Sequence, residues 1–327
     1  MPSAVRSTAP TRFAYLGPEG TFAEAALRIL VASLGTTTGV HGGGAEGVDR
    51  PAAGIGAALD AVRAGECAAA LVPLENSVEG SVPATMDGLV DGAPLVVTRE
   101  VFLEVGFVLA VRPGVALADV HTVASHPHAL AQTRGRLAAL LPAADVLPTS
   151  STADAARRVA GGEHDAAVCA AIAAERYGLE VLSADLADHP GAVTRFVLVE
   201  RPGALPAPTG ADKTTVTAVV PDRTGALLDL LTEFAVRGIS LTRIESRPTR
   251  ERLGVYSFSI DCEGHVADAR VGDALAALHR QSAEVRFLGS YPRADALPGK
   301  PVADRVGDTA FAEAQAWLAR VREGAAG

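Results

Sequence analysis

Short apolar segments alternate with helical segments along the first 200 residues. The apolar segments include FAYLG at 13–17, CAAALVP at 67–73 and TRFVLVE at 194–200. Strands that are apolar along their whole length are typical of a sheet that helices cover on both faces. The alternation therefore predicts an α/β domain built on a mostly parallel sheet.

The helix after the first of these strands has recognisable ends. Thr21 and Glu24 have the spacing of a capping box, and Gly35 is a natural stop for the helix. The following segment, 35–56, is rich in glycine and has no hydrophobic periodicity, which predicts a loop. The pattern of a phosphate-binding loop is not met there, because no Lys-Ser or Lys-Thr pair follows the glycines.

The pattern changes after residue 200. Residues 201–212, RPGALPAPTGAD, are rich in proline, glycine and alanine and predict a linker. Beyond the linker, strands and helices follow one another in the order βαββαβ up to about residue 292, which is typical of a ferredoxin-like unit. We therefore expect a second domain at 213–292 and a C-terminal extension at 293–327.

Composition excludes several classes of protein. The formal charge of −9 and the pI near 5.4 argue against a nucleic-acid-binding protein, which normally has a basic surface. No apolar run has the length of a membrane helix, and the start of the chain lacks the apolar core of a secretory signal. The three cysteines lie far apart, which suits a reducing compartment and small core residues. We expect a cytoplasmic protein with no nucleic-acid partner, no membrane partner and no cofactor.

Polar side chains gather at four junctions where a predicted strand meets a helix. In open α/β sheets, ligands bind beyond the carboxyl ends of the strands, so these junctions are where a site is expected. The junctions are GPEGTF at 17–22, PLENSVEGS at 73–81, SHPHALAQ at 125–132 and TSSTADAA at 149–156.

Each junction also has a plainer interpretation. Thr21 would then be only a helix cap, and so would one of the hydroxyl groups before Asp154. The second junction would be an ordinary polar turn with Ser81 as the cap. At the third junction we expect Ser125 to cap the helix, with one histidine near the cleft. His126 and His128 are two residues apart, but no third ligand has a suitable spacing, so no metal site is predicted.

The ordered set of motifs resembles the prephenate dehydratase family. YLGPEGTF, VPLENSVEGSV, SHPHALAQ, STADAA, YGL and TRFVLVE occur in the order and at roughly the spacing of that family. The second domain resembles the ACT regulatory domain through GALLDLL and ESRP. Each motif alone is modest, but the ordered set is highly specific. The resemblance covers about residues 12–292.

The resemblance implies a fold for each part of the chain. It implies a catalytic domain at 12–200 with the two-lobed, type II periplasmic-binding-protein-like fold, whose second lobe covers about 95–185. The site would lie in the cleft between the lobes. Residues 213–292 would form the βαββαβ ferredoxin-like ACT domain.

The resemblance also implies an activity. Prephenate dehydratases convert prephenate to phenylpyruvate with loss of water and carbon dioxide, as regulated homodimers or homotetramers whose effector is L-phenylalanine. Two alternatives stay open. An arogenate dehydratase performs the same elimination on the amino analogue, and a non-catalytic amino-acid sensor would keep the cleft and the ACT domain without the chemistry.

Roles are carried over at matching positions. Thr194 takes the place of the family's essential threonine, as a positioned donor to the departing hydroxyl group, and Glu75, His126 or a water molecule would relay the proton. Arg195 has two interpretations, as the partner of a substrate carboxylate or as a member of a structural ion pair. The substrate contacts implied are Thr21, Asn76, Ser77, His126, Ser151, Thr152 and Arg195.

The effector site implied by the resemblance lies in the second domain. It comprises the start of the first crossover helix and the ESRP motif. Thr224 stands where the family usually has a proline, which changes the loop before the helix. The effector residues implied are Gly225, Ala226, Leu227, Glu245, Ser246, Arg247 and Pro248.

Overall fold

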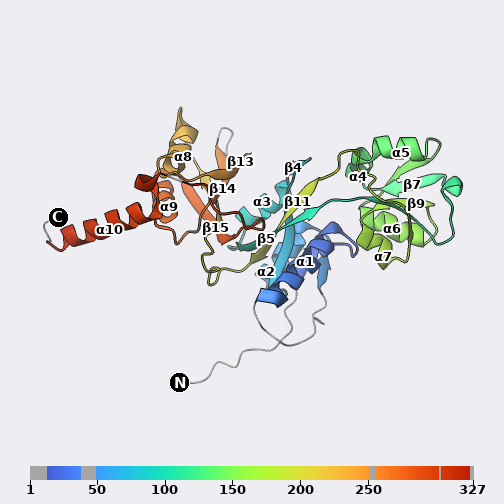
Figure 1. Ribbon diagram of the computed structural model, residues 1–327, viewed down its shortest axis with the longest axis horizontal. Helices are drawn as coiled ribbons and strands as arrows, with labels where there is room; N and C mark the ends of the chain where they lie inside the picture. Colours follow the sequence, from blue (N-terminus) through green and yellow to red (C-terminus); the bar gives the residue numbers. More distant parts are fainter. Residues whose placement is uncertain (1–12, 38–48, 250–254, 302, 325–327) are drawn as a thin grey trace, which may run out of the picture. The chain divides into compact units, whose positions relative to one another are not determined.

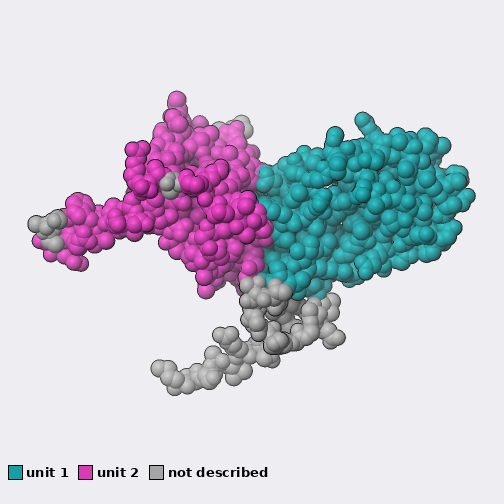
Figure 2. All heavy atoms as spheres, in the orientation of Figure 1, with its two compact units in different colours: residues 1–88, 101–199 teal, residues 89–100, 200–327 magenta. Residues whose placement is uncertain are grey.

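The computed structural model describes residues 13–37, 49–249, 255–301 and 303–324. The chain divides into two compact units, Met1–Gly88 with Val101–Val199 and Leu89–Glu100 with Glu200–Gly327 (Figure 2). They are called the first and the second unit below. The first unit holds two sheets with helices, and the second holds a separate antiparallel sheet with helices. The predicted fold class is confirmed.

The first sheet has the strand order β2-β1-β3-β11-β5, with β4 paired to β3. Strand β1 runs parallel to both of its neighbours. The buried residues of α1 pack against this sheet through Leu27 and Leu30, which contact the cluster around Leu71 and Phe196. The elements are β1 (Phe13–Leu16), α1 (Phe22–Thr37), β2 (Arg50–Ala52), α2 (Ile55–Arg63), β3 (Ala69–Asn76), β4 (Gly80–Ser81), α3 (Pro83–Val90), β5 (Val96–Glu104) and β11 (Val193–Glu200).

The second sheet has the order β10-β6-β9-β7-β8. Strand β7 is parallel to β8 and β9, whereas β6 is antiparallel to β9 and β10. Helices α4 and α5 lie on one side of it and α6 and α7 on the other (Figure 1). The elements are β6 (Val108–Val111), η1 (Leu117–Asp119), β7 (Thr122–Ser125), α4 (Pro127–Gln132), α5 (Arg134–Leu140), β8 (Asp145–Pro148), α6 (Thr152–Ala160), β9 (Ala166–Cys169), α7 (Ala171–Arg176) and β10 (Glu180–Ser183).

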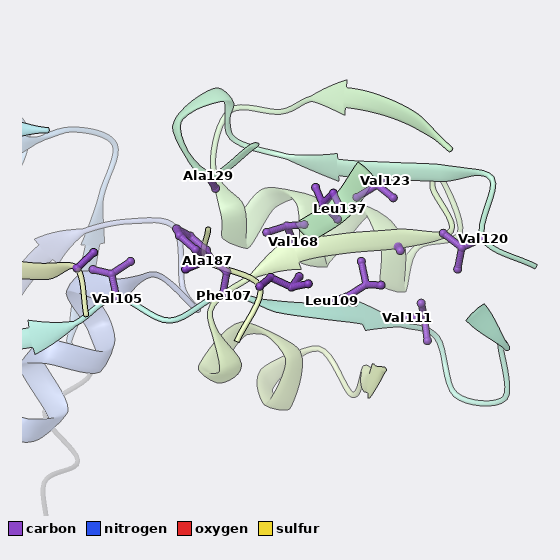
Figure 3. Close-up of a cluster of buried hydrophobic side chains, with 13 residues drawn as sticks. Val105, Phe107, Leu109, Val111, Val120, Val123, Ala129, Leu137, Val168 and Ala187 are labelled. Carbon is purple, nitrogen blue, oxygen red and sulfur yellow. The ribbon is translucent and has the colours of Figure 1, made fainter. Parts of the chain in front are cut away.

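Strand β6 shows why these strands are apolar throughout. Its four residues are all buried, and successive side chains point to opposite faces. Leu109 and Val111 pack with Leu137 in the cluster drawn in Figure 3, whereas Val108 and Ala110 pack against the alanines of α6 and α7. One strand therefore supplies two cores, as the apolar segments predict.

The second unit has an antiparallel sheet of order β13-β14-β12-β15. Leu230 and Phe234 of α8 and Leu278 of α9 pack on Val216 and Ile260 of this sheet. The elements are β12 (Asp212–Val219), α8 (Ala226–Ala235), β13 (Leu241–Pro248), β14 (Tyr256–Glu263), α9 (Ala269–Gln281), β15 (Glu284–Pro292), η2 (Asp304–Val306) and α10 (Asp308–Arg322). The predicted βαββαβ order is confirmed.

Several predicted boundaries are wrong. Helix α1 continues past Gly35 to Thr37. Strand β2 lies within the predicted loop at 35–56, of which residues 38–48 are outside the described part. Parallel pairing with β1 holds these residues in a strand, which the glycine-rich sequence does not predict.

The alternation of strands and helices also predicts one helix and one sheet too few, whereas the two-lobed fold implied by the resemblance is confirmed. The single helix expected after residue 125 breaks at Thr133, whose backbone leaves the helical region and whose side chain donates to the Ala129 carbonyl. Strand β10 was not expected, because Glu180–Ser183 is a largely exposed edge strand without an apolar run. The strands also form two sheets, the second of mixed direction, rather than one mostly parallel sheet.

The cysteines lie where the sequence predicts. Cys67, Cys169 and Cys262 are free and buried. Burial raises the pKa of the Cys169 and Cys262 thiols to about 12, so neither is a thiolate near neutral pH. Within the described ranges, no helix combines the length and the apolar character needed to cross a membrane.

Candidate active site

A cleft of about 500 Å³ lies in the first unit. Its walls come from the β1–α1 junction, the turn after β3, the start of α4, the start of α6 and the start of β11. Four of these are the polar junctions of the sequence, now joined by the TRF segment. The predicted site residues that line the cleft are Thr21, Asn76, His126, Ser151, Thr152 and Thr194.

The Thr194 side chain accepts a hydrogen bond from the end of a neighbouring strand. The Asn76 amide nitrogen Nδ2 donates to Thr194 Oγ1 over 2.8 Å. The orientation of that amide is assigned from its other contacts, because Asn76 Oδ1 accepts from the backbone N–H groups of Val78 and Glu79 at 2.8 and 3.0 Å. Thr194 therefore accepts from Asn76, and its own proton donates to no other residue in the described part of the chain.

Strand alternation separates Thr194 from Arg195. Thr194 and Phe196 line the cleft, while Arg195 is buried on the other face of β11. Arg195 Nη1 lies 3.9 Å from Glu75 Oε2, and neither residue lines the cleft. Of the two interpretations of Arg195, the geometry favours the structural ion pair.

Ser77 also lies outside the cleft lining and holds the entry to β11. Its backbone N–H donates to the Val193 carbonyl over 2.9 Å, and its Oγ accepts from the Val193 N–H over 2.9 Å. These two bonds tie the turn after β3 to the residue before Thr194. Ser77 therefore fixes the position of the strand that carries Thr194.

At the first junction, Thr21 is engaged within its own segment. Its hydroxyl donates to the Leu16 carbonyl over 2.9 Å and accepts from the Glu24 N–H over 3.5 Å. Glu24 Oε2 accepts from the Gly20 N–H over 2.6 Å. Burial of Glu24 opposes its ionisation, but this hydrogen bond and those from Arg176 and Arg28 keep its pKa below the usual range. The Thr21 proton is thus used locally, which leaves only a lone pair for a ligand.

The fourth junction offers a free hydroxyl group at a helix N-terminus. Ser151 caps α6 by accepting from the Asp154 N–H over 2.9 Å. Asp154 is buried, which opposes ionisation, yet hydrogen bonds from Arg157 and Ser150 hold its pKa below the usual range. The Thr152 side chain makes no hydrogen bond to any described residue. Thr152 and the first turn of α6 can therefore donate to an anionic group in the cleft.

At the third junction, the predicted cap is wrong. Ser125 is fully buried and donates to the Val168 carbonyl over 2.6 Å. His126 caps α4 instead, because its Nδ1 accepts from the His128 N–H over 3.3 Å. Burial and the charge of His128 lower the pKa of His126, and together they outweigh Glu79, which raises it. A neutral His126 with Nδ1 as acceptor carries its proton on Nε2, where it is a donor.

Replacing His126 by asparagine is expected to remove a pH dependence of stability. Unfolded His126 titrates near 6.5 and the folded residue below it, so between these values the unfolded state binds more protons. The stabilising contribution is complete above pH 6.5 and is lost as the pH falls through the folded pKa. Asparagine also caps helices but does not titrate. Urea unfolding at several pH values should show the wild type losing more stability on acidification than His126→Asn; parallel curves would contradict the assignment.

Some cleft residues were not predicted. Glu79, Gln132 and Phe107 line the cleft, and Phe107 meets Phe22 edge-to-face with ring centroids 5.6 Å apart. Glu79 belongs to the second junction and Gln132 is the last residue of the third. They were not predicted to meet, because no sequence rule pairs residues of different junctions. No group of three or more His, Cys, Asp or Glu side chains placed to hold a metal ion occurs among the described residues.

The comparisons with known proteins agree with the resemblance seen in the motifs. The sequence pattern of prephenate dehydratase matches residues 13–204 and that of the ACT domain matches residues 214–280. A prephenate dehydratase of Mycolicibacterium vanbaalenii is 52% identical over 313 residues, which cover 95% of this chain and 98% of the relative.

Solved structures show the same similarity. The prephenate dehydratase of Arthrobacter aurescens in complex with L-Phe is 48% identical with a TM-score of 0.85, covering 96% of this chain and 100% of that one. A structure described as GqqA, a novel type of quorum quenching acylase, is 31% identical with a TM-score of 0.75, covering 86% and 97%. The family pattern spans more than half of this chain and the relatives span nearly all of it. The chain therefore belongs to the prephenate dehydratase family.

Proposed function

We propose that the protein is a lyase that converts prephenate to phenylpyruvate, water and carbon dioxide. The observation that carries the proposal is the Thr194 hydroxyl group, which accepts from Asn76 and so presents its proton in the cleft. Membership of the family supports the same activity.

The cleft suits both parts of the reaction. As the ring C–OH bond breaks, its electron pair leaves with the oxygen, and Thr194 donates to the developing hydroxide. The bond to the ring carboxylate then gives its electron pair to the ring, which becomes aromatic as carbon dioxide leaves. Thr152 and the N-terminus of α6 supply donors for the two carboxylates. We favour His126 over Glu75 as the group behind Thr194, because only His126 lines the cleft.

The domain limits are part of the proposal. We assign residues 12–200 to the catalytic domain, with the second lobe at about 95–185, residues 201–212 to the linker, 213–292 to the ACT domain and 293–327 to the extension. The matched ranges 13–204 and 214–280 support these limits. Strand β5 carries the boundary between the two compact units, so the units and the domains differ at 89–100.

L-Phenylalanine is the proposed effector, acting on a homodimer or homotetramer. The ACT match and the similar structure in complex with L-Phe support this. Gly225 precedes α8 with φ 83°, a conformation that favours glycine, and Leu227 is partly exposed. Glu245 Oε2 lies 3.6 Å from Arg243 Nη1, and Glu245 Oε1 lies 3.7 Å from Arg247 Nη1. The proposed effector residues are Gly225, Ala226, Leu227, Glu245, Ser246, Arg247 and Pro248.

An absorbance assay of phenylpyruvate release tests the activity. Purified protein is expected to turn over prephenate faster than arogenate, and added L-phenylalanine is expected to change the rate. A preference for arogenate would establish the closest alternative. Phenylalanine binding without turnover of either compound would establish the sensor. A structure 31% identical to this chain is described as an acylase, so similarity alone does not identify the reaction. The assay therefore measures phenylpyruvate itself.

Replacing Asn76 by alanine is expected to lower kcat for prephenate about 10–100-fold with a smaller effect on KM. The substitution removes the donor that orients the Thr194 hydroxyl group but leaves that group in place. Steady-state kinetics of Asn76→Ala and Asn76→Gln provide the measurement. Wild-type kcat in Asn76→Ala would show that Thr194 needs no orientation from this amide.

A further inference from the structure

Glu79 puts a carboxylate in a cleft that is proposed to receive a dianion. Its Oε2 lies 2.5 Å from His128 Nδ1, and its Oε1 accepts from Gln132 Nε2 over 2.8 Å. All three residues line the cleft. Glu79 follows β3 of the first sheet, whereas His128 and Gln132 are one turn apart on α4, which follows β7 of the second sheet. The three side chains thus join the two sides of the cleft.

The contact requires a proton between Glu79 and His128. A carboxylate only accepts, so His128 Nδ1 must be the donor, and Gln132 donates through its amide. The His126 ring lies beside this contact, with its centroid 5.0 Å from that of the His128 ring. Burial and the charge of His128 lower the pKa of His126. Both oxygens of Glu79 are thus engaged, one by His128 Nδ1 and the other by the Gln132 amide.

A purely structural role explains these contacts poorly. The His128 side chain is 66% exposed and that of Glu79 is 37% exposed. Ion pairs this exposed contribute little to stability. An ionised Glu79 without its partner, however, would repel a dianion that enters the same cleft.

We propose that Glu79, His128 and Gln132 form a clamp that joins the two sides of the cleft and masks the charge of Glu79 from the dianionic substrate. The clamp residues are positioning residues. They set the affinity for a doubly charged ligand over a singly charged one. The inference rests on the proposed function, because it takes prephenate as the ligand.

A rescue experiment separates charge masking from a structural role. Dissociation constants for prephenate and for phenylpyruvate, a monoanion, are measured by calorimetry at low and high salt. The proteins carry Thr194→Val, which is expected to slow turnover during the titration. To this background are added His128→Leu, Glu79→Gln, both together, and His189→Leu as an exposed histidine outside the cleft lining.

His128→Leu is expected to weaken prephenate binding about three- to tenfold at low salt, with a smaller change for phenylpyruvate and at high salt. Adding Glu79→Gln to His128→Leu is expected to restore the affinity, and His189→Leu is expected to change nothing. Weakened binding without rescue, or equal losses for both ligands, would overturn charge masking. Wild-type protein that neither turns over nor binds prephenate would overturn the proposed function as well, whereas turnover without rescue would overturn the clamp alone.

Discussion

Replacing Thr194 by valine is expected to lower kcat for prephenate about 10²–10³-fold, the typical cost of removing one donor from developing negative charge. Valine keeps the β-branched shape that suits a strand, so the packing of β11 is retained. The hydroxyl group is the only feature removed. Steady-state kinetics by phenylpyruvate absorbance give the measurement.

The effect falls on kcat because the donor acts on charge that develops during the reaction. In the bound substrate the ring hydroxyl is neutral, and the bond from Thr194 strengthens only as the oxygen leaves. Thr194 is 8% exposed, so little water is available to replace its donor. KM is expected to change much less than kcat.

Two controls make this result specific. Thr194→Ser restores a hydroxyl group and is expected to recover much of the activity. L-Phenylalanine binding by Thr194→Val is expected to remain nearly intact, because the proposed effector residues lie in the ACT domain. Near-normal phenylpyruvate formation by Thr194→Val would refute the role of this residue.

Replacing Lys213 by methionine is expected to lower the free energy of unfolding of the second unit by about 3–5 kcal/mol. Lys213 Nζ lies 3.1 and 2.9 Å from the two carboxylate oxygens of Glu100, and their side chains are 7% and 0% exposed. Methionine removes the cation and leaves a buried carboxylate, which also accepts from the Ala294 N–H over 3.0 Å. Urea unfolding of the wild type and of Lys213→Met, followed by circular dichroism, gives the measurement.

The double variant Lys213→Met with Glu100→Leu provides the control. It removes both charges, and replacing a whole buried pair by apolar side chains is often nearly neutral. Most of the lost stability is therefore expected to return. Wild-type stability in Lys213→Met alone would contradict the view that this pair is a coupled buried unit.

The sequence predicts most elements of the fold because their signals are local. The apolar strands and the βαββαβ order can be recognised from periodicity and from the linker. Strands β2 and β10 were not predicted, because pairing with a neighbouring strand, rather than their own residues, makes them strands. The break at Thr133 was not predicted for a related reason, since a single threonine inside a helical pattern does not by itself indicate a helix end.

The candidate site was predicted from motifs, but its hydrogen bonds were not. The opposite placement of Thr194 and Arg195 follows from strand alternation, and that signal was available in the sequence. The pairing of Glu79 with Gln132 joins residues 53 positions apart, which no local rule predicts. Likewise, the choice of His126 over Ser125 as the cap depends on where β7 ends, and boundaries are the least predictable part of an element.

The most direct test of the account is a crystal structure of Thr194→Val with prephenate bound. We expect the ring hydroxyl to lie against the side chain at position 194, beside the Asn76 amide, with a carboxylate at Thr152 and the N-terminus of α6. Prephenate bound with its ring hydroxyl turned away from position 194, or bound outside this cleft, would contradict it.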